Sequence, residues 1–117
     1  MSGDAPRLWL KVDFGARGQI GPGKIALLRA IAEQASISAA AKSIGMSYRK
    51  AWLLIDQLNQ TVGRPVVETQ VGGSAGGGAQ LTAPGRRLID CYERLQTQAE
   101  SGSDDQLRAL AKMMEGA

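Results

Sequence analysis

The 117-residue sequence contains no histidine and a single cysteine, Cys91. Without an imidazole, the chain has no histidine for general acid–base catalysis, for a serine–histidine triad or for most zinc sites. The lone cysteine excludes a disulfide within the chain and is typical of a protein kept in a reducing cytosol. We therefore expect a cytoplasmic protein with no metal site and no cofactor.

Aromatic residues make up only 4% of the chain, so its core has to be built from Leu, Ile, Val and Ala. No apolar run approaches the roughly 20 residues that a membrane-spanning helix needs. The N-terminal MSGDAPRL lacks the basic start and apolar stretch of a secretory signal. We expect one domain with a modest core and no membrane partner.

The formal net charge of +3 is unevenly distributed along the chain. Residues 1–94 carry 12 basic and 7 acidic side chains, a net +5, whereas residues 95–117 carry 2 and 4, a net −2. The basic excess lies in the body of the chain, where it suits a polyanionic partner, and the tail is slightly acidic.

The N-terminal third predicts a strand and then a helix. Residues 8–14 (LWLKVDF) alternate apolar and polar side chains, as a half-buried strand does. Turn residues follow, and from Lys24 the apolar period becomes that of a helix, which ends near Gln34.

A second, short helix and a tight turn come next. Ser38 is its predicted N-cap, because a serine hydroxyl accepts from a free backbone N–H. Gly45 is expected to end it, and Met46 to fill the corner of the turn. Ser47 then caps a longer helix that reaches about Val62.

At 100° per residue, this longer helix has two distinct faces. We expect Tyr48 and Trp52 to belong to the core rather than to stack on bases, because they share the apolar face. The apolar face holds Tyr48, Ala51, Trp52, Ile55, Leu58 and Val62, and the opposite face holds Arg49, Lys50, Leu53, Asp56, Gln57 and Gln60.

A strand, a glycine-rich loop and a second strand follow, at residues 65–71, 72–78 and 79–81. Thr82 is the predicted N-cap of the next helix. The buried face of that helix is expected to hold Leu88, Cys91, Tyr92, Leu95 and Ala99, with the cysteine as an inert buried thiol. Residues 101–103 break it, and 104–115 form a last amphipathic helix with Asp104 and Asp105 at its positive end.

This order of elements is that of a winged helix-turn-helix. The predicted fold is mainly α with a small β wing (α+β), with an N-terminal strand and a C-terminal amphipathic helix. Residues 1–19 form the strand and lead-in, 20–100 the DNA-binding domain, and 101–117 a helical tail for dimerisation or a partner.

The longer helix is the candidate DNA reader, since the major groove of B-DNA admits one helix. Ser47, Arg49 and Lys50 are placed to reach base edges or phosphates, Leu53 a thymine methyl, and Gln57 an adenine. A merely solvated helix face is the alternative. Arg64 fits a phosphate contact or a solvated charge equally well.

The glycine-rich loop has the Gly-x4-Gly spacing of a P-loop in Gly72 and Gly77. However, Gly78 and Ala79 stand where the lysine and the hydroxyl residue would have to be, so we expect no nucleotide site. A wing tip is the better interpretation, because glycines let backbone N–H groups approach a sugar-phosphate edge closely. A plain hairpin is the alternative. The tip residues assigned to DNA are Gly72, Gly73, Ser74, Gly76 and Gly77.

These segments resemble the N-terminal DNA-binding domain of the ModE family of molybdate-responsive bacterial regulators, whose winged helix is similar to that of LysR-type regulators. The segments that carry the resemblance are SISAAAKSIGMSYRKAW (36–52), LNQ (58–60), VVE (66–68), GGSAGGGAQLT (72–82) and GRRLI (85–89). By this resemblance, Ser47, Tyr48, Arg49 and Lys50 lie nearest the DNA, and the family binds palindromic operators as a homodimer. The family's molybdate-binding C-terminal region has no counterpart before Ala117, so we assign no molybdate ligands.

Two hypotheses about function remain. The first is a sequence-specific, dimeric DNA-binding regulator of molybdenum uptake or molybdoenzyme genes. The second is a winged-helix module that binds a protein through its C-terminal helix; the cations Arg49 and Lys50 favour DNA, while Asp56 and the modest net charge suit this alternative. An enzyme is the least favoured class, since the chain shows no nucleophile–base pair, no metal cluster and no complete phosphate motif.

Overall fold

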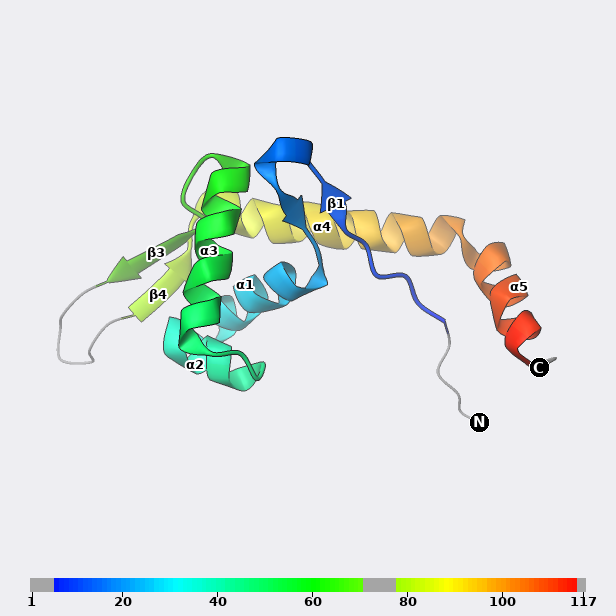
Figure 1. The fold of residues 1–117 in the computed structure, drawn as a ribbon, viewed down its shortest axis with the longest axis horizontal. Helices are drawn as coiled ribbons and strands as arrows, with labels where there is room; N and C mark the ends of the chain where they lie inside the picture. The colour runs from blue at the N-terminus through cyan, green and yellow to red at the C-terminus, as the bar shows by residue number, and fades with distance from the viewer. Residues whose placement is uncertain (1–5, 71–77, 116–117) are drawn as a thin grey trace.

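A computed structural model describes residues 6–70 and 78–115 of the chain (Figure 1). Helices dominate, with two small antiparallel strand pairs, so the predicted fold class is confirmed. In order, the elements are β1 (Val12–Asp13), the 3-10 turn η1 (Gly15–Arg17), β2 (Gln19–Ile20), α1 (Pro22–Gln34), α2 (Ile37–Ser43), α3 (Tyr48–Val62), β3 (Val67–Gln70), β4 (Gly78–Leu81), α4 (Ala83–Gly102) and α5 (Asp104–Glu115).

The molecule is elongated, 59 × 33 × 21 Å, with its body at one end (Figure 1). There α1, α2, α3 and the β3–β4 hairpin pack together, while α4 runs along the body and beyond it, and α5 bends away at the far end. In the described part of the chain, no helix combines the length and the apolar character that crossing a bilayer requires.

The core forms around α1, which contacts α2, α3, α4 and β4. Ile25, Leu27, Leu28 and Ile31 of α1 have no solvent exposure at all. Small residues let the neighbouring helices come close, since Ala40, Ala41 and Ala51 are almost completely buried at the contact. The aliphatic core predicted from the scarcity of aromatics is therefore confirmed, with Tyr92 as its one buried aromatic among the described residues.

One predicted helix start is wrong by two residues. Ser36, not Ser38, caps α2, and its Oγ accepts from the N–H of Ala39 at 3.1 Å. The earlier start puts Ile37 in the first turn of the helix, where its side chain is 5% exposed and joins the core. Ser38 is exposed within the helix. Burial of Ile37 thus selects which of the two serines is the cap.

The two strands predicted at residues 8–14 and 65–71 are shorter than expected. Of residues 8–14, only Val12 and Asp13 pair, with Ile20 and Gln19. The strand predicted at residues 65–71 begins only at Val67, because the N–H of Val66 donates to Asn59 Oδ1 at 2.9 Å. The carbonyl of Val66 still accepts from the N–H of Thr82, the residue opposite it.

The predicted buried face of α4 is partly wrong. Tyr92 is buried, but Cys91 and Leu95 are exposed. The helix meets the rest of the chain along a narrow stripe of Leu88, Ile89, Tyr92 and Gln96, and the neighbours of Tyr92 and Gln96 one position away face solvent. The break predicted at residues 101–103 is confirmed at Ser103 only, since Ser101 and Gly102 still belong to α4.

A glycine allows the closest backbone approach in the core. A Cβ on Gly85, in the first turn of α4, would lie 2.2 Å from the carbonyl oxygen of Val66, so one of the two backbones would have to move. We expect Gly85→Ala to lower the free energy of unfolding by about 1–3 kcal/mol, the usual cost of overpacking. Chemical denaturation measures this loss.

Gly23→Ala is the matched control, since a Cβ there meets nothing within 4 Å. We expect it to leave stability within about 0.5 kcal/mol of the wild type. Equal stability of the two variants would contradict the tight contact between Gly85 of α4 and the backbone of Val66, the residue before β3.

Candidate nucleic-acid interface

The α2–turn–α3 unit is held by backbone hydrogen bonds at its corner. Gly45 has a φ of 69°, in the left-handed region that was predicted to require glycine. The N–H of Met46 donates to the carbonyl of Ala41 at 2.9 Å, and the half-buried Met46 side chain packs against the core. Ser47 is the predicted N-cap of α3, and its Oγ accepts from the N–H of Lys50 at 3.1 Å. The turn and the start of α3 are thus fixed by local bonds.

The two predicted faces of α3 are confirmed over most of its length. Ala51, Ile55 and Leu58 are buried, together with Thr61 in the last turn. Leu53 is 54% exposed, in the middle of a face that is otherwise polar. The exposed residues of this face are Arg49, Lys50, Leu53, Asp56, Gln57 and Gln60.

Tyr48 does not lie in the core, which corrects the prediction made for it. Its side chain is 56% exposed, and its ring meets the ring of Trp52 edge to face at 6.4 Å. Trp52 is half-buried and packs against the core as expected. Tyr48 is the first residue of α3, one turn ahead of the helix's contact with the core, so only Trp52 reaches inward.

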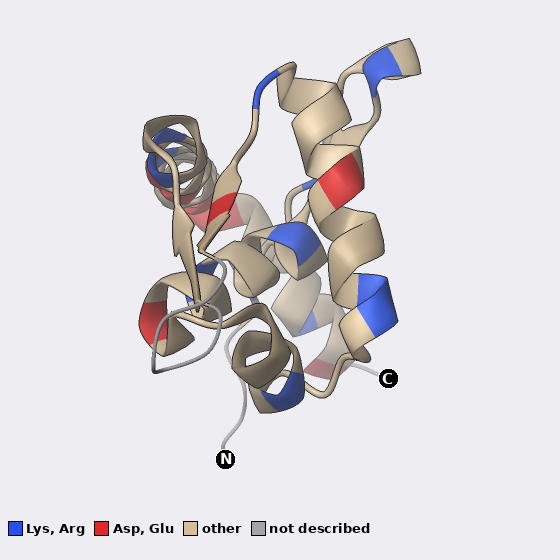
Figure 2. Cartoon of the chain, turned by 90° about the vertical axis from the view of Figure 1, so that its left-hand side faces the viewer, with Lys and Arg blue, Asp and Glu red and all other residues tan. Residues whose placement is uncertain are grey.

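The first turn of α3 carries two basic residues and no acidic one. Figure 2 views the end that carries α3 and the β3–β4 hairpin, with basic residues on the first turn of α3 and one acidic residue, Asp56, further along it. None of the ion pairs formed among the described residues involves Arg49, Lys50 or Arg64. These three exposed cations therefore have their charge available for an anionic partner.

The β3–β4 hairpin is attached to the body near the start of α2. Its register pairs Val67 with Leu81 and Gln70 with Gly78, and the N–H of Ala79 donates to the carbonyl of Ala35 at 3.0 Å. The predicted wing-tip residues, Gly72, Gly73, Ser74, Gly76 and Gly77, lie outside the described residues.

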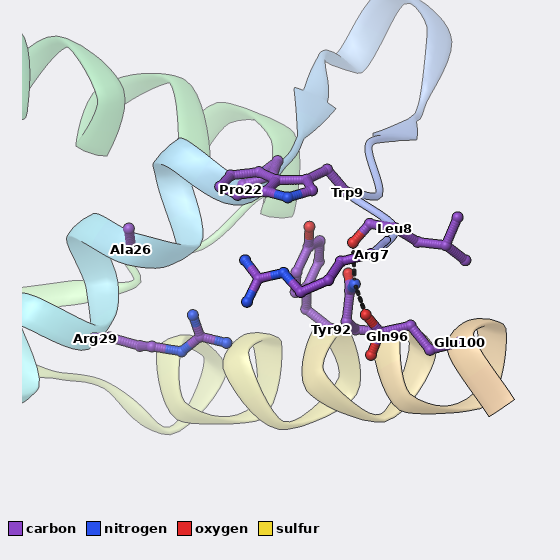
Figure 3. A pocket seen from close by; sticks show the side chains of 9 residues that line it. All are labelled: Arg7, Leu8, Trp9, Pro22, Ala26, Arg29, Tyr92, Gln96 and Glu100. Carbon is purple, nitrogen blue, oxygen red and sulfur yellow. Dashed lines mark hydrogen bonds between the residues drawn. The ribbon is translucent and has the colours of Figure 1, made fainter. Parts of the chain in front are cut away.

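A separate recess of about 300 Å³ lies where the N-terminal segment crosses α1 and α4 (Figure 3). Three of the polar side chains that line it, those of Arg29, Tyr92 and Gln96, have partners within the chain. Tyr92 Oη donates to the carbonyl of Leu10 at 2.6 Å, the Gln96 amide donates to the carbonyl of Leu8, and Arg29 pairs with Glu93 at 2.8 Å. Burial raises the pKa of the Tyr92 phenol, so its hydroxyl stays protonated and able to donate up to a higher pH than an exposed tyrosine would. We interpret the recess as part of the contact by which Tyr92 and Gln96 hold the N-terminal segment on α4.

One contact was not predicted from the sequence at all, the docking of the β1–β2 hairpin on the last turn of α3. Arg17 and Thr61 exchange two hydrogen bonds there although they are 44 residues apart. The only signal in the sequence was the turn at Arg17 and Gly18, and nothing in it indicated where the turn would dock.

A capped helix-turn-helix with an exposed second helix, followed by a strand hairpin, defines the winged helix-turn-helix class. Residues 23–86 match the family described as "Bacterial regulatory helix-turn-helix protein, lysR family". The chain belongs to this family.

Curated relatives agree with the resemblance to ModE proteins. The chain is 45% identical to the molybdenum-pterin-binding protein MopB of Rhodobacter capsulatus, over 70% of this chain and 30% of MopB. It is 39% identical to the molybdenum transport protein ModE of Azotobacter vinelandii, over 84% of this chain and 36% of that protein. It is 47% identical to the DNA-binding transcriptional dual regulator ModE of Escherichia coli K12, over 63% of this chain and 28% of that protein. The chain thus spans about a third of the length of these relatives.

Solved structures share the fold. The CbnR DNA-binding domain in complex with DNA has a TM-score of 0.56 and 25% identity, over 76% of this chain and 95% of that one. The LysR family transcriptional regulator VV2_1132 has a TM-score of 0.54 and 20% identity, over 71% of this chain and 27% of that one. At this identity the similarity shows the fold alone.

The contact between the N-terminal segment and α4 can be tested by removing the Tyr92 hydroxyl. We expect Tyr92→Phe to lower the free energy of unfolding by about 1 kcal/mol, because the carbonyl of Leu10 loses its donor. Thermal unfolding measures the change. Tyr48→Phe removes the same atom from an exposed ring and should leave stability unchanged. A Tyr92→Phe variant as stable as Tyr48→Phe would show that the bond does not hold the segment.

Proposed function

We propose that the chain is the DNA-binding part of a sequence-specific transcriptional regulator of the ModE type, controlling molybdenum uptake or molybdoenzyme genes. The observation that carries this proposal is the exposed face of α3, with two cations in its first turn that no acidic group pairs with in the described structure. The names of the relatives support the link to molybdenum and to regulation.

The dimensions of α3 suit the major groove. Its 15 residues extend over about 22 Å at 1.5 Å per residue, while the groove is about 12 Å wide and 8.5 Å deep. The first turns of the helix therefore enter the groove, where Ser47, Tyr48, Arg49 and Lys50 meet base edges and the nearest phosphates. Leu53 lies one turn further and suits a thymine methyl, and Gln57 suits the N6 and N7 atoms of adenine.

Backbone contacts complete the proposed interface. Arg64 lies just beyond the far end of α3 and is exposed, as a phosphate contact has to be. The glycine-rich tip, Gly72, Gly73, Ser74, Gly76 and Gly77, is proposed to follow the sugar-phosphate edge beside the groove. These contacts position the protein and carry no base preference.

The proposed partner is a palindromic operator bound by a homodimer. A dimer with two-fold symmetry binds two half-sites whose centres are one helical turn of DNA, or a multiple of one turn, apart. The largest exposed apolar side chains of α4 and α5 are those of Leu95, Leu110, Met113 and Met114. The α5 helix lies at the end of the molecule away from the body (Figure 1). A second copy seated on these side chains would leave both α3 helices free for DNA.

A protein-interaction module is the second candidate, and the same apolar face of α5 favours it. Leu110 is 51% exposed and Met113 and Met114 are each 68% exposed. A partner protein docked on this face would bind with little dependence on salt, whereas DNA binding weakens steeply as salt rises.

Removing either first-turn cation should weaken operator binding. The operator is first selected from a random duplex pool at about 100–150 mM salt, where nonspecific binding is suppressed. We expect Arg49→Ala and Lys50→Ala each to lower affinity. Where the removed side chain binds a phosphate, the slope of log K against log salt should also fall by about 1.

Arg108→Ala is the control, because it removes the same charge from α5, where Arg108 pairs with Asp104 and Asp105. If both α3 variants bind the operator as tightly as this control, the proposed reading face is wrong.

A further inference from the structure

The β1–β2 hairpin is joined to the end of α3 by a reciprocal pair of hydrogen bonds. Arg17 Nε donates to the carbonyl of Thr61 at 3.1 Å, and Thr61 Oγ1 donates to the carbonyl of Arg17 at 2.7 Å. Thr61 is 6% exposed and is the one polar residue buried in the described part of the chain. The hairpin therefore has a defined position relative to α3.

The β1–β2 hairpin and the last turn of α3 pack closely against each other. Gly18 has a φ of 117°, and a Cβ there would lie 2.6 Å from Thr61 Oγ1. A Cβ on Gly63, the residue that ends α3, would lie 3.2 Å from Arg17 Nη2. The guanidinium of Arg17 thus lies against the last turn of α3, directly before Arg64.

Three cations lie on or next to the hairpin. Arg17 is in its η1 turn, at the end that meets α3, whereas Lys11 directly precedes β1 and Lys24 is in the first turn of α1. Lys24 Nζ donates to the carbonyl of Gln19 at 2.7 Å, and Lys24 is close enough to Lys11 for that charge to help lower its pKa, after the larger effect of burial. The one acidic residue of the hairpin, Asp13, uses its Oδ1 to accept from the N–H of Gly15 at 2.8 Å. No described ion pair involves Lys11, Arg17 or Lys24.

The η1 turn projects beyond the end of α3 that is opposite the first-turn cations, on the side where α3 is exposed (Figure 2). In helix-turn-helix docking, the N-terminal residues of the recognition helix contact the base edges. The last turn of α3, at the other end of a helix about 22 Å long, then lies farther from the base edges and nearer the phosphate backbone. A cation held there meets a phosphate.

We propose that the β1–β2 hairpin is a further DNA-backbone contact, in which Arg17, next to Arg64, binds a phosphate at the end of α3 remote from Arg49 and Lys50. Arg17 Nε is used by Thr61, which leaves the N–H groups of both Nη atoms for the phosphate. The hairpin lies before the residues 23–86 that match the lysR family, so this contact is additional to the winged helix-turn-helix. It rests on the proposed function.

Arg17 also stabilises the fold, since a cation near a helix C-terminus interacts favourably with the carbonyl end. The test therefore uses Arg17→Gln, which keeps an N–H donor for Thr61 but removes the charge, and Arg17→Lys, which keeps the charge. The matched control is Arg108→Gln on α5. Thermal unfolding of all variants is measured beside operator binding at several salt concentrations.

We expect Arg17→Gln to bind the selected operator more weakly at low salt, with a salt slope reduced by about 1 and an unchanged base preference. For one phosphate contact, the advantage of the wild type over this variant should shrink roughly threefold to fourfold between 50 and 200 mM salt. Arg17→Lys should restore the slope.

An Arg17→Gln variant with the affinity and salt slope of Arg108→Gln, in a chain whose binding still depends on Arg49, would overturn the hairpin contact alone. A wild-type chain that shows no salt-dependent DNA binding would refute the proposed function and this contact with it. Lower affinity that follows lower thermal stability, with the wild-type slope, would assign Arg17 a structural role only and would also refute the contact.

Discussion

The structure depends on the complete burial of one face of α1. Four of its aliphatic side chains have no solvent exposure, and α2, α3, α4 and β4 all pack against it. Burying such side chains stabilises the fold by about 1.5–3 kcal/mol each, which is a large contribution in a domain of this size. Because α2 and α3 are both positioned by α1, the orientation of the exposed face of α3 follows from this core and not from the surface residues themselves.

Local chemistry could be predicted from the sequence wherever neighbouring residues decide it. Ser47 and Thr82 cap their helices as expected, and Gly45 and Gly63 adopt the left-handed conformation expected at helix ends. The cap of α2 was wrong because two serines compete there, and the burial of Ile37 decides between them. That burial is a tertiary effect, which helix periodicity does not contain.

Longer-range packing explains the other differences. The buried face of α4 was predicted too wide, because the pattern shows which residues are apolar but not how narrow the covering segment is. Cys91 and Leu95 are exposed for this reason. The exposed and buried faces of α3 were predicted correctly over most of its length, because helix periodicity decides them. The prediction that Tyr48 lies in the core was wrong, because its position depends on where the helix meets the core. The docking of Arg17 on Thr61 joins segments 44 residues apart, and no local rule indicates such a pair.

The N-terminal segment joins two helices that have different proposed roles. At one end, the carbonyls of Leu8 and Leu10 accept from Gln96 and Tyr92 of α4, and at the other Arg17 and Thr61 hold it on α3. Three of these contacts use backbone carbonyls of the segment, those of Leu8, Leu10 and Arg17, which remain the same when its side chains change, and the Arg17 side chain adds a fourth. The segment therefore links the helix proposed to read DNA with the helix that leads to α5. If a second copy binds at the α4–α5 end, this link limits how far each α3 can turn relative to its own α4, which favours a fixed distance between the two half-sites that the dimer reads.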